Sequence, residues 1–183
     1  MASFHRKQVI IIMAVEKNNG IGLQNKLPWP RIPEDMEHFK SITTRCKDDY
    51  NKINAVIMGR KTLESMGEKP LLKRVNVVVS TTYEMKKDNR NFIVLPNVKK
   101  AIDFLQYEDS IEDIFIIGGS EIFSEGIQYA DRVIITRIQE HYDCDVFIKD
   151  EFFGLLGLNF KMSSKQTIKS SIPIEIEYYE RNQ

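Results

Sequence analysis

The sequence has few of the features that assign a chain quickly to a class of protein. Its 183 residues include only two cysteines, Cys46 and Cys144. Their spacing fits neither a disulfide framework nor a pair of metal ligands, which favours a reducing compartment. The apolar run Val9–Val15 is too short to span a bilayer, and no signal-peptide cleavage site follows it. We therefore expect a cytoplasmic protein that is not in a membrane.

The chain has no formal net charge at neutral pH. Lysine plus arginine and aspartate plus glutamate both number 26, so no overall field favours nucleic acid or a membrane surface. Apolar residues make up 42% of the chain, which excludes wholesale disorder. The length suffices for one domain with its own core, and no repeat or linker interrupts it. We expect a single domain over residues 1–183.

Short apolar runs alternate with helical periodicity along most of the chain. The expected strands are Val9–Val15, Ala55–Met58, Val75–Val79, Phe92–Leu95, Ile114–Ile117 and Val133–Ile138. The expected helices are Pro33–Thr43, Lys61–Met66, Val98–Tyr107 and Glu121–Tyr129. This alternation predicts an α/β fold: a mostly parallel central sheet with helices on both faces.

The C-terminal part of the chain breaks the alternation. Lys165–Lys169 and Ile174–Tyr179 are separated by a short turn and predict a C-terminal antiparallel hairpin. The period-two pattern of the second segment is typical of an antiparallel edge strand. We expect Gly154–Ser164 to be a long irregular connection, and Arg45–Lys52 and Glu84–Asn91 to be polar surface connections.

One carboxylate lies where a helix needs apolar side chains. Pro33 begins the expected helix, and Asp35, Phe39 and Ile42 follow at the spacing of one helical face. Burying an acid costs free energy unless a cation or hydrogen-bond donor meets it. A first-turn acid can also be explained by the helix dipole alone, which contributes about 0.3–1 kcal/mol. Asp35 is thus a candidate functional acid with a plain structural alternative.

Three strands end in segments that suit phosphate groups. These segments are Gly59–Thr62, Ser80–Thr82 and Gly118–Ser120. In an open α/β sheet, ligands bind beyond the carboxyl ends of the strands, and helix N-termini bind anions. None of the segments is a G-x-G-x-x-G or Walker sequence, and each alone is explained by turn formation or solvated charge. Together they favour a nucleotide with several phosphates.

These residues, taken in order, resemble the dihydrofolate reductase family from about Val9 to Tyr179. The segments that carry the resemblance are Ala14-Val15, Asn19–Gly22, Leu27–Pro30, Asp35-Met36, Phe39, Val56–Thr62, Pro70-Leu71, Arg74, Ile116–Ser120 and Thr136-Arg137. The resemblance implies a monomeric oxidoreductase of one-carbon metabolism. It would transfer hydride from NADPH to C6 of dihydrofolate while N5 gains a proton, giving tetrahydrofolate.

The resemblance also assigns residues to the substrate. Asp35 would bind the 2-amino group and N3 of the pterin, and the apolar surroundings should raise its pKa. Trp29 would hold a water near the proton path, and Thr136 would hydrogen-bond to Asp35 and the pterin. Arg74 would pair with the α-carboxylate of the glutamate tail, although a surface ion pair would also explain it. The residues expected to line the pteridine and benzoyl part of the site are Met13, Ala14, Leu27, Met36, Phe39, Met66, Leu71 and Ile117.

On the cofactor side, Arg60 would reach the 2′-phosphate that distinguishes NADPH from NADH. The segment Asn18–Lys26 matches the mobile loop that covers the nicotinamide in the family. The residues expected to bind NADPH are Ala14, Ile21, Gly22, Gly59, Arg60, Lys61, Thr62, Ser80, Thr81, Thr82, Gly118, Gly119, Ser120, Glu121 and Ile122. No metal ligand is expected. The family pattern further implies cis peptide bonds at Gly118–Gly119 and Lys69–Pro70.

Some positions depart from the family pattern, and two alternatives remain. Phe123 replaces a common tyrosine near the nicotinamide, and Thr81 lacks the cationic side chain of some relatives. One alternative is another pterin- or pyrimidine-directed reductase of the same fold, such as the reductase of riboflavin synthesis; Trp29, Asp35 and Arg74 argue against it. The other is a non-catalytic nucleotide-binding module, which would have lost the acid or the glycine pair.

Overall fold

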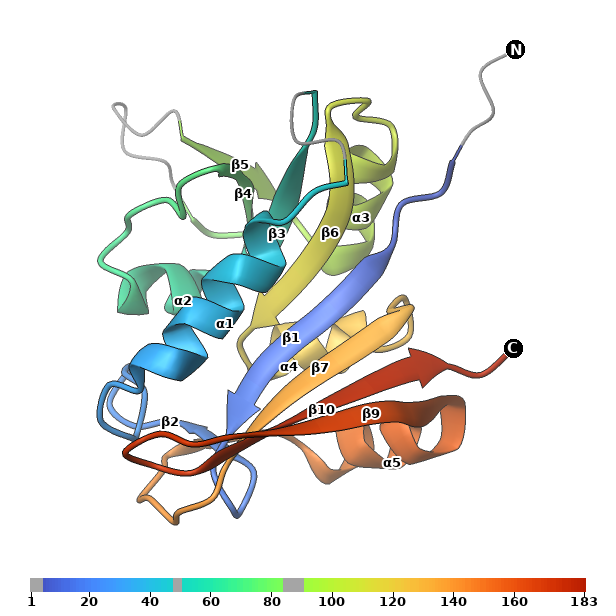
Figure 1. The fold of residues 1–183 in the computed structure, drawn as a ribbon. Coiled ribbons are helices and arrows are strands. Elements are labelled where there is room, and N and C mark those ends of the chain that lie inside the picture. The colour runs from blue at the N-terminus through green and yellow to red at the C-terminus, as the bar shows by residue number, and fades with distance from the viewer. Residues whose placement is uncertain (1–4, 48–50, 84–90) are drawn as a thin grey trace.

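The computed structural model describes residues 5–47, 51–83 and 91–183 (Figure 1). Its main sheet has eight strands in the order β5-β4-β3-β6-β1-β7-β10-β9. Their bounds are β1 Val9–Val15, β3 Ile53–Gly59, β4 Arg74–Val79, β5 Phe92–Leu95, β6 Ile111–Gly118, β7 Arg132–Ile138, β9 Phe160–Ile168 and β10 Ile174–Arg181. A small second sheet pairs β2, Gly20–Gly22, with β8, Val146–Phe147.

Five helices cover both faces of the large sheet among the described residues. They are α1 Pro33–Thr44, α2 Arg60–Ser65, α3 Val98–Gln106, α4 Ser120–Gly126 and α5 Asp150–Asn159. In Figure 1, α1 and α2 lie in front of the sheet, and α3, α4 and α5 lie behind it. The buried residues of α3, α4 and α5 join one core cluster, whereas α1 and α2 pack against the other. None of these helices is long and apolar enough to cross a membrane.

Strand β1 lies at the centre of the sheet, and this position explains the unbroken apolar sequence of the strand. Its neighbours β6 and β7 are both parallel to it, and helices cover both of its faces. Ile11 and Val15 therefore pack into one core cluster, and Ile10 and Ile12 into the other. Each such buried side chain contributes about 1.5–3 kcal/mol of transfer free energy.

The predicted α/β fold is confirmed, with two errors near the C-terminus. Residues expected to be irregular form the end of α5 and the start of β9. Gly154 and Gly157 lower helix propensity by about 1 kcal/mol each, but Phe152 and Leu156 are buried in the core and hold the helix in place. The predicted hairpin exists, but β9 is its edge strand, because β10 lies between β7 and β9.

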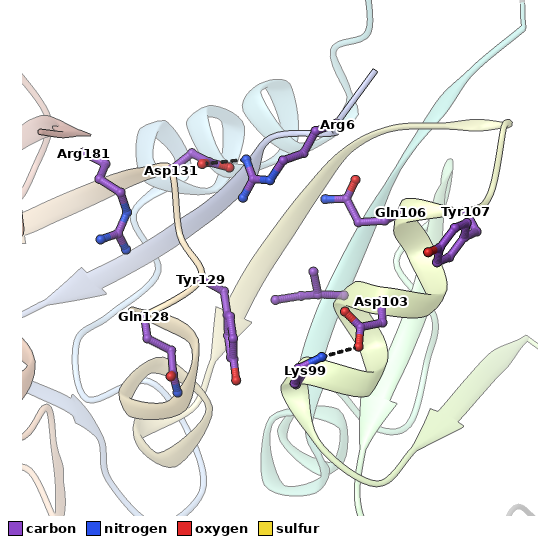
Figure 2. A pocket seen from close by; sticks show the side chains of 10 residues that line it. Arg6, Lys99, Asp103, Gln106, Tyr107, Gln128, Tyr129, Asp131 and Arg181 are labelled. Atoms are coloured by element: carbon purple, nitrogen blue, oxygen red, sulfur yellow. Dashed lines mark hydrogen bonds and ion pairs between the residues drawn. The ribbon is translucent and has the colours of Figure 1, made fainter. Parts of the chain in front are cut away.

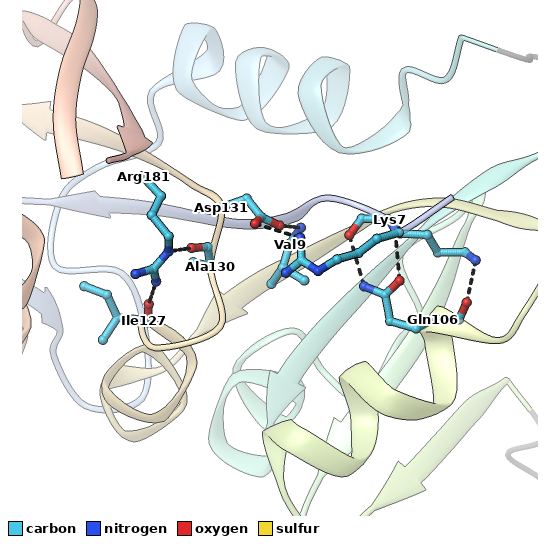
Figure 3. A network of polar contacts seen from close by, with 8 residues as sticks. Lys7, Val9, Gln106, Ile127, Ala130, Asp131 and Arg181 are labelled. Atoms are coloured by element: carbon cyan, nitrogen blue, oxygen red, sulfur yellow. Dashed lines mark hydrogen bonds and ion pairs between the residues drawn. The ribbon is translucent and has the colours of Figure 1, made fainter. Parts of the chain in front are cut away.

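Asp131, directly before β7, binds the amino-terminal end of β1 through hydrogen bonds (Figure 3). Its carboxylate accepts hydrogen bonds from the Val9 backbone N–H at 2.8 Å and from Arg6 Nη1 at 2.8 Å. Nearby, Arg181 of β10 donates to the carbonyl groups of Ala130 and Ile127, each at 2.7 Å. These hydrogen bonds thus join the starts of β1 and β7 and the end of β10. They lie at the amino-terminal ends of the parallel strands, opposite the expected site.

Of the expected surface connections, residues 48–50 and 84–90 lie outside the described part of the chain. Lys47, Asn51 and Asn91 at the margins of these ranges are exposed, as expected.

Candidate active site

The sequence-predicted ligand segments meet at one edge of the sheet. Strands β1, β3, β4, β6 and β7 are mutually parallel, so their carboxyl ends lie together. The connection from β1 to β3 runs through α1 on one face, and the connection from β6 to β7 runs through α4 on the other. The first connection passes β6 in one direction along the sheet, and the second passes β1 in the opposite direction. This reversal is the position where open α/β sheets bind their ligands.

Asp35 lies in the first turn of α1, facing the end of β1. It is half-buried, and burial raises the pKa of its carboxyl group above the ordinary value, while a hydrogen bond from the Thr136 side chain acts in the opposite direction. Thr136 is only 2% exposed and pairs with Ala14 in the β1–β7 register. Three expected site residues from three elements are therefore neighbours. The helix dipole alone does not explain a partly desolvated acid with this partner.

The apolar residues expected to line the substrate site differ in their exposure. Trp29 is buried in a small cluster against which Ala14 also packs. Leu27 and Met36 are 60% and 46% exposed, so both present apolar surface to solvent. The remaining expected lining residues, Phe39, Met66, Leu71 and Ile117, are half-buried against one common core cluster. Exposed apolar surface around a polar group is typical of a ligand-binding site.

Met13 is the exception among the substrate-side residues. Its side chain is buried in the core cluster on the α3–α4–α5 face, away from Phe39 and Met66. Only its backbone can face a ligand near Asp35, because successive side chains of a strand point to opposite faces.

Arg74, at the start of β4, is oriented by uncharged groups rather than by an ion pair. Its Nη1 donates to Thr43 Oγ1 at 2.8 Å and its Nε to the Leu72 carbonyl at 2.9 Å. Burial lowers the pKa of the guanidinium below its usual value. Within the described part of the chain its Nη2 has no hydrogen-bond partner, so part of the fork remains available for a carboxylate.

On the cofactor side, the Gly118–Gly119 peptide bond is cis, as expected. Gly118 has φ +116°, and a Cβ atom there would lie 3.0 Å from the Phe123 ring. At Gly119 the nearest atom to an added Cβ would be Thr62 Oγ1 at 3.7 Å, so this backbone is open to approach. Among the described residues, no side chain caps the N-terminus of α2 or of α4. Backbone N–H groups of both first turns are therefore available for phosphate oxygens.

The other cofactor-side residues are mostly exposed. Arg60 forms an ion pair with Glu64 one turn along α2, with Nε and Oε1 separated by 2.7 Å. Ser80 Oγ accepts the backbone N–H groups of Thr82 and Tyr83 at 3.2 and 2.9 Å and so forms the turn after β4. Lys61, Thr81, Thr82 and Glu121 are exposed, and Thr62 and Ser120 are half-buried. Ile122 is buried in the core, so only its backbone can face a cofactor.

The Lys69–Pro70 bond was expected to be cis, and this expectation is wrong, because the structure has it trans. An X–Pro bond favours trans by about 0.5–1 kcal/mol, so cis needs a turn that demands it. Here Gly67 and Glu68, with φ of 68° and 56°, turn the chain before the proline is reached.

One depression of the described surface lies away from these residues, near the amino-terminal ends of β1 and β7 (Figure 2). It has a volume of about 590 Å³ and lies between α3, the turn after α4 and the end of β10. Arg6 pairs with Asp131, and Lys99 pairs with Asp103. Arg181, which also lines the depression, donates to the backbone carbonyl groups of Ala130 and Ile127.

Fold and site together define an α/β enzyme with a small-molecule site at the carboxyl edge of a parallel sheet. A family model described as dihydrofolate reductase matches residues 8–181. The chain therefore belongs to the dihydrofolate reductase family. This membership confirms the expected class of enzyme, one that reduces dihydrofolate and uses a nicotinamide cofactor.

Individual relatives agree with the family assignment. The chain is 38% identical over 149 residues to the dihydrofolate reductase of Drosophila melanogaster, covering 78% of this chain and 81% of that protein. It is 32% identical over 179 residues to the enzyme of Heliothis virescens, covering 93% and 94%. It is also 38% identical over 174 residues to a bifunctional dihydrofolate reductase-thymidylate synthase of Paramecium tetraurelia, covering 94% of this chain but only 34% of that protein.

Proposed function

We propose that this chain reduces 7,8-dihydrofolate to 5,6,7,8-tetrahydrofolate with NADPH as the preferred hydride donor. The observation that carries the proposal is the partly buried Asp35, with its raised pKa and its Thr136 partner, at the ligand-binding edge of the sheet. When bound, the cofactor supplies a hydride to C6 of the pteridine. The protein's own contribution is to bind, orient and desolvate the two reactants.

Asp35 stabilises the protonated pterin. A carboxylate facing the 2-amino group and N3 accepts two hydrogen bonds and favours positive charge on the ring. Burial strengthens this interaction, and Thr136 fixes the orientation of the carboxylate. The buried Trp29 holds a water near the proton path, and the exposed Leu27 and Met36 supply the apolar wall.

Arg74 binds the α-carboxylate of the glutamate tail, and the glycine-bounded helix termini bind the pyrophosphate. Support for the first comes from the guanidinium of Arg74, which Thr43 orients and whose Nη2 has no hydrogen-bond partner among the described residues. Support for the second comes from the open backbone at Gly119. Arg60 gives up its ion pair with Glu64 and binds the 2′-phosphate, together with the hydroxyl groups of Ser80–Thr82.

A direct assay tests this function. With purified protein, the absorbance of NADPH should fall only when dihydrofolate is added. NADH should replace NADPH poorly as the hydride donor. Asp35→Asn is the matched variant, since it keeps the shape of the side chain and removes its charge. If the wild-type protein shows no dihydrofolate-dependent consumption of either cofactor, the proposal is wrong.

We also propose that the chain acts as a single monomeric domain in the cytoplasm. One eight-stranded sheet includes the elements from β1 to β10 with the exception of the small β2–β8 pair, which supports one folding unit. Light scattering should give a mass near 21.3 kDa, and a value twice as large would contradict the monomer.

A further inference from the structure

A histidine and a tyrosine that the proposed reaction leaves unused meet between α1 and the sheet. His38 Nε2 and the Tyr178 hydroxyl oxygen lie 3.1 Å apart, within hydrogen-bond distance. The two rings also pack edge to face, with their centroids 6.3 Å apart and an angle of 77° between their planes. Both side chains are half-buried. Because Tyr178 belongs to β10, the pair attaches the helix that carries Asp35 to a strand beyond β7.

Burial keeps both rings uncharged at neutral pH. It lowers the pKa of the His38 imidazole and raises the pKa of the Tyr178 phenol, because each charged form would lose hydration. The positive charges of Arg132 and Arg45 act on the phenol in the opposite direction but do not outweigh burial. A neutral imidazole with its proton on Nδ1 accepts the phenol proton at Nε2. The contact is therefore a hydrogen bond between two neutral groups.

This hydrogen bond lies beside the contact between Asp35 and Thr136. Asp35 and His38 are three residues apart on α1, a spacing that places both on one face of the helix. On the sheet, Thr136 of β7 pairs with Ile176 of β10, two residues before Tyr178. Thr136 and Tyr178 are therefore diagonal neighbours on one face of the sheet. Two side chains of α1 thus bind two adjacent strands side by side.

The first turn of α1 depends on such contacts more than the last turn does. Its N-cap residue, Ile32, has no side-chain oxygen that could bind the free backbone N–H groups. At the other end of the helix, Asn54 Nδ2 donates to the carbonyl groups of Thr43 and Arg45 at 3.1 and 2.8 Å. The position of Asp35 in the first turn therefore depends on what the helix contacts on β7 and β10.

We propose that His38 is a positioning residue: with Tyr178 it holds the first half of α1 against β10, and so it keeps Asp35 against Thr136 and shielded from water. This inference rests on the function proposed above. His38 acts through Asp35 and not on the reactants. Loss of the contact lets the first turn move away from the sheet and admits water to the carboxylate. Electrostatic interactions weaken in water, so Asp35 then stabilises a protonated pterin less well.

The test compares two tyrosine-to-phenylalanine substitutions on β10. Tyr178→Phe keeps the ring and removes only the hydroxyl group that binds His38. Tyr179→Phe is the control, since the side chain of Tyr179 points to the opposite face of the sheet, where its hydroxyl group donates to Glu177 Oε2 at 2.7 Å. Each variant loses one hydrogen bond from the same strand, so the control accounts for a general loss of stability. Only the loss at Tyr178 should reach Asp35.

Two measurements report on Asp35. The NMR chemical shift of its carboxyl carbon, followed across pH in the protein without ligands, gives its pKa, and the absence of this signal from Asp35→Asn assigns it. Single-turnover oxidation of NADPH by dihydrofolate gives the rate of hydride transfer. In Tyr178→Phe the pKa of Asp35 should fall toward its ordinary value, because water reaches the carboxyl group. The rate should fall about three- to tenfold, the equivalent of one neutral hydrogen bond.

The control sets the outcomes that would overturn the proposal. Tyr179→Phe should match the wild type in both measurements, and the NADPH dissociation constant should be the same in both variants and the wild type. An unchanged pKa of Asp35 or an unchanged rate in Tyr178→Phe would refute the positioning role. Equal changes in the two variants would refute it as well, because they would reflect a general loss of stability.

A second substitution tests the pair from the side of the helix. His38→Phe keeps an aromatic ring next to Tyr178 and removes the imidazole nitrogen atoms. It should reproduce Tyr178→Phe, and the double variant should be no worse than either single variant, because the same hydrogen bond is lost only once. Additive losses would mean that the two side chains act separately, against the proposal. Wild-type protein that oxidises no NADPH with dihydrofolate would instead refute the proposed function, while the titration of Asp35 would still test the position of α1.

Discussion

The Thr136 side chain on β7 hydrogen-bonds to the carboxyl group of Asp35 on α1 and so joins the central sheet to the helix that covers it. A buried threonine and a half-buried aspartate from distant parts of the sequence thereby form one unit. The hydroxyl group lowers the pKa of Asp35, and burial raises it by more.

Asp35→Asn should lose activity. Near neutral pH, turnover should fall by about 10²-fold or more, the scale of positioned acid–base groups. The loss should shrink at low pH, where the pterin is protonated without help. Steady-state rates across pH measure this, with Glu34→Gln, an exposed acid of the same helical turn, as the control. Near-wild-type turnover of Asp35→Asn at neutral pH would contradict the role.

The same substitution should stabilise the fold at neutral pH. Because the pKa of Asp35 is raised in the folded protein, its contribution to stability is greatest below the unfolded pKa and is lost as pH rises through the folded pKa. Asparagine does not ionise, so the variant does not lose stability as pH rises to neutral. Such a gain is expected where a functional residue lowers the stability of the fold. Thermal unfolding at neutral and acidic pH should show a higher Tm for the variant only at neutral pH. A lower Tm at both would contradict this reasoning.

Arg60→Leu should discriminate between the two cofactors. If Arg60 leaves Glu64 for the 2′-phosphate, the KM for NADPH should rise by the equivalent of roughly 1.5–3 kcal/mol, and the KM for NADH much less. Lys99→Leu is a matched control, since Lys99 forms the same i,i+4 type of ion pair, with Asp103, on α3. Equal effects of Arg60→Leu on both cofactors would mean that Arg60 contacts only the parts they share.

The two adjacent glycines should respond differently to alanine. Gly119→Ala fits the free protein, since the nearest atom is 3.7 Å from the added methyl group, so stability should change little while the NADPH dissociation constant rises about tenfold. Gly118→Ala has positive φ and meets the Phe123 ring, so it should cost about 1–3 kcal/mol of unfolding free energy. Urea unfolding and cofactor titration of both variants test the distinction, which equal stabilities would refute.

Arg74→Lys should weaken binding of the glutamate tail. Lysine keeps the charge but loses the planar fork that Thr43 orients, so the KM for dihydrofolate should rise about tenfold with little change in kcat. A pterin substrate without the glutamate should be reduced equally well by variant and wild type. If the variant also impaired that substrate, Arg74 would have a role other than tail binding.

Patterns that depend on burial and proline geometry were predictable from the sequence. Strands Val9–Val15 and Phe92–Leu95 begin and end at the predicted residues, and α1 starts at Pro33 as expected. Helix α5 was not predictable from propensity, because Gly154 and Gly157 oppose a helix that only tertiary packing stabilises.

At the site, motif positions predicted which segments would meet but not the direction of every side chain. Met13 and Ile122 lie at the expected places in the fold, yet both side chains point into the core. His38 escaped notice because its partner, Tyr178, lies 140 residues further along the chain. Such contacts leave no periodic signal in a sequence.

The central position of β1 has a consequence for how the chain folds. β1 is synthesised before both of its neighbours in the sheet, because β6 and β7 begin only at Ile111 and Arg132. Until those segments leave the ribosome, its row of isoleucine and valine side chains has no native neighbours in the sheet. Pairing between strands that lie far apart in the sequence slows folding. Until it occurs, an apolar strand that is prone to aggregation is exposed to other chains. Nascent protein that stops short of Ile138 should therefore depend on chaperones far more than the finished molecule does.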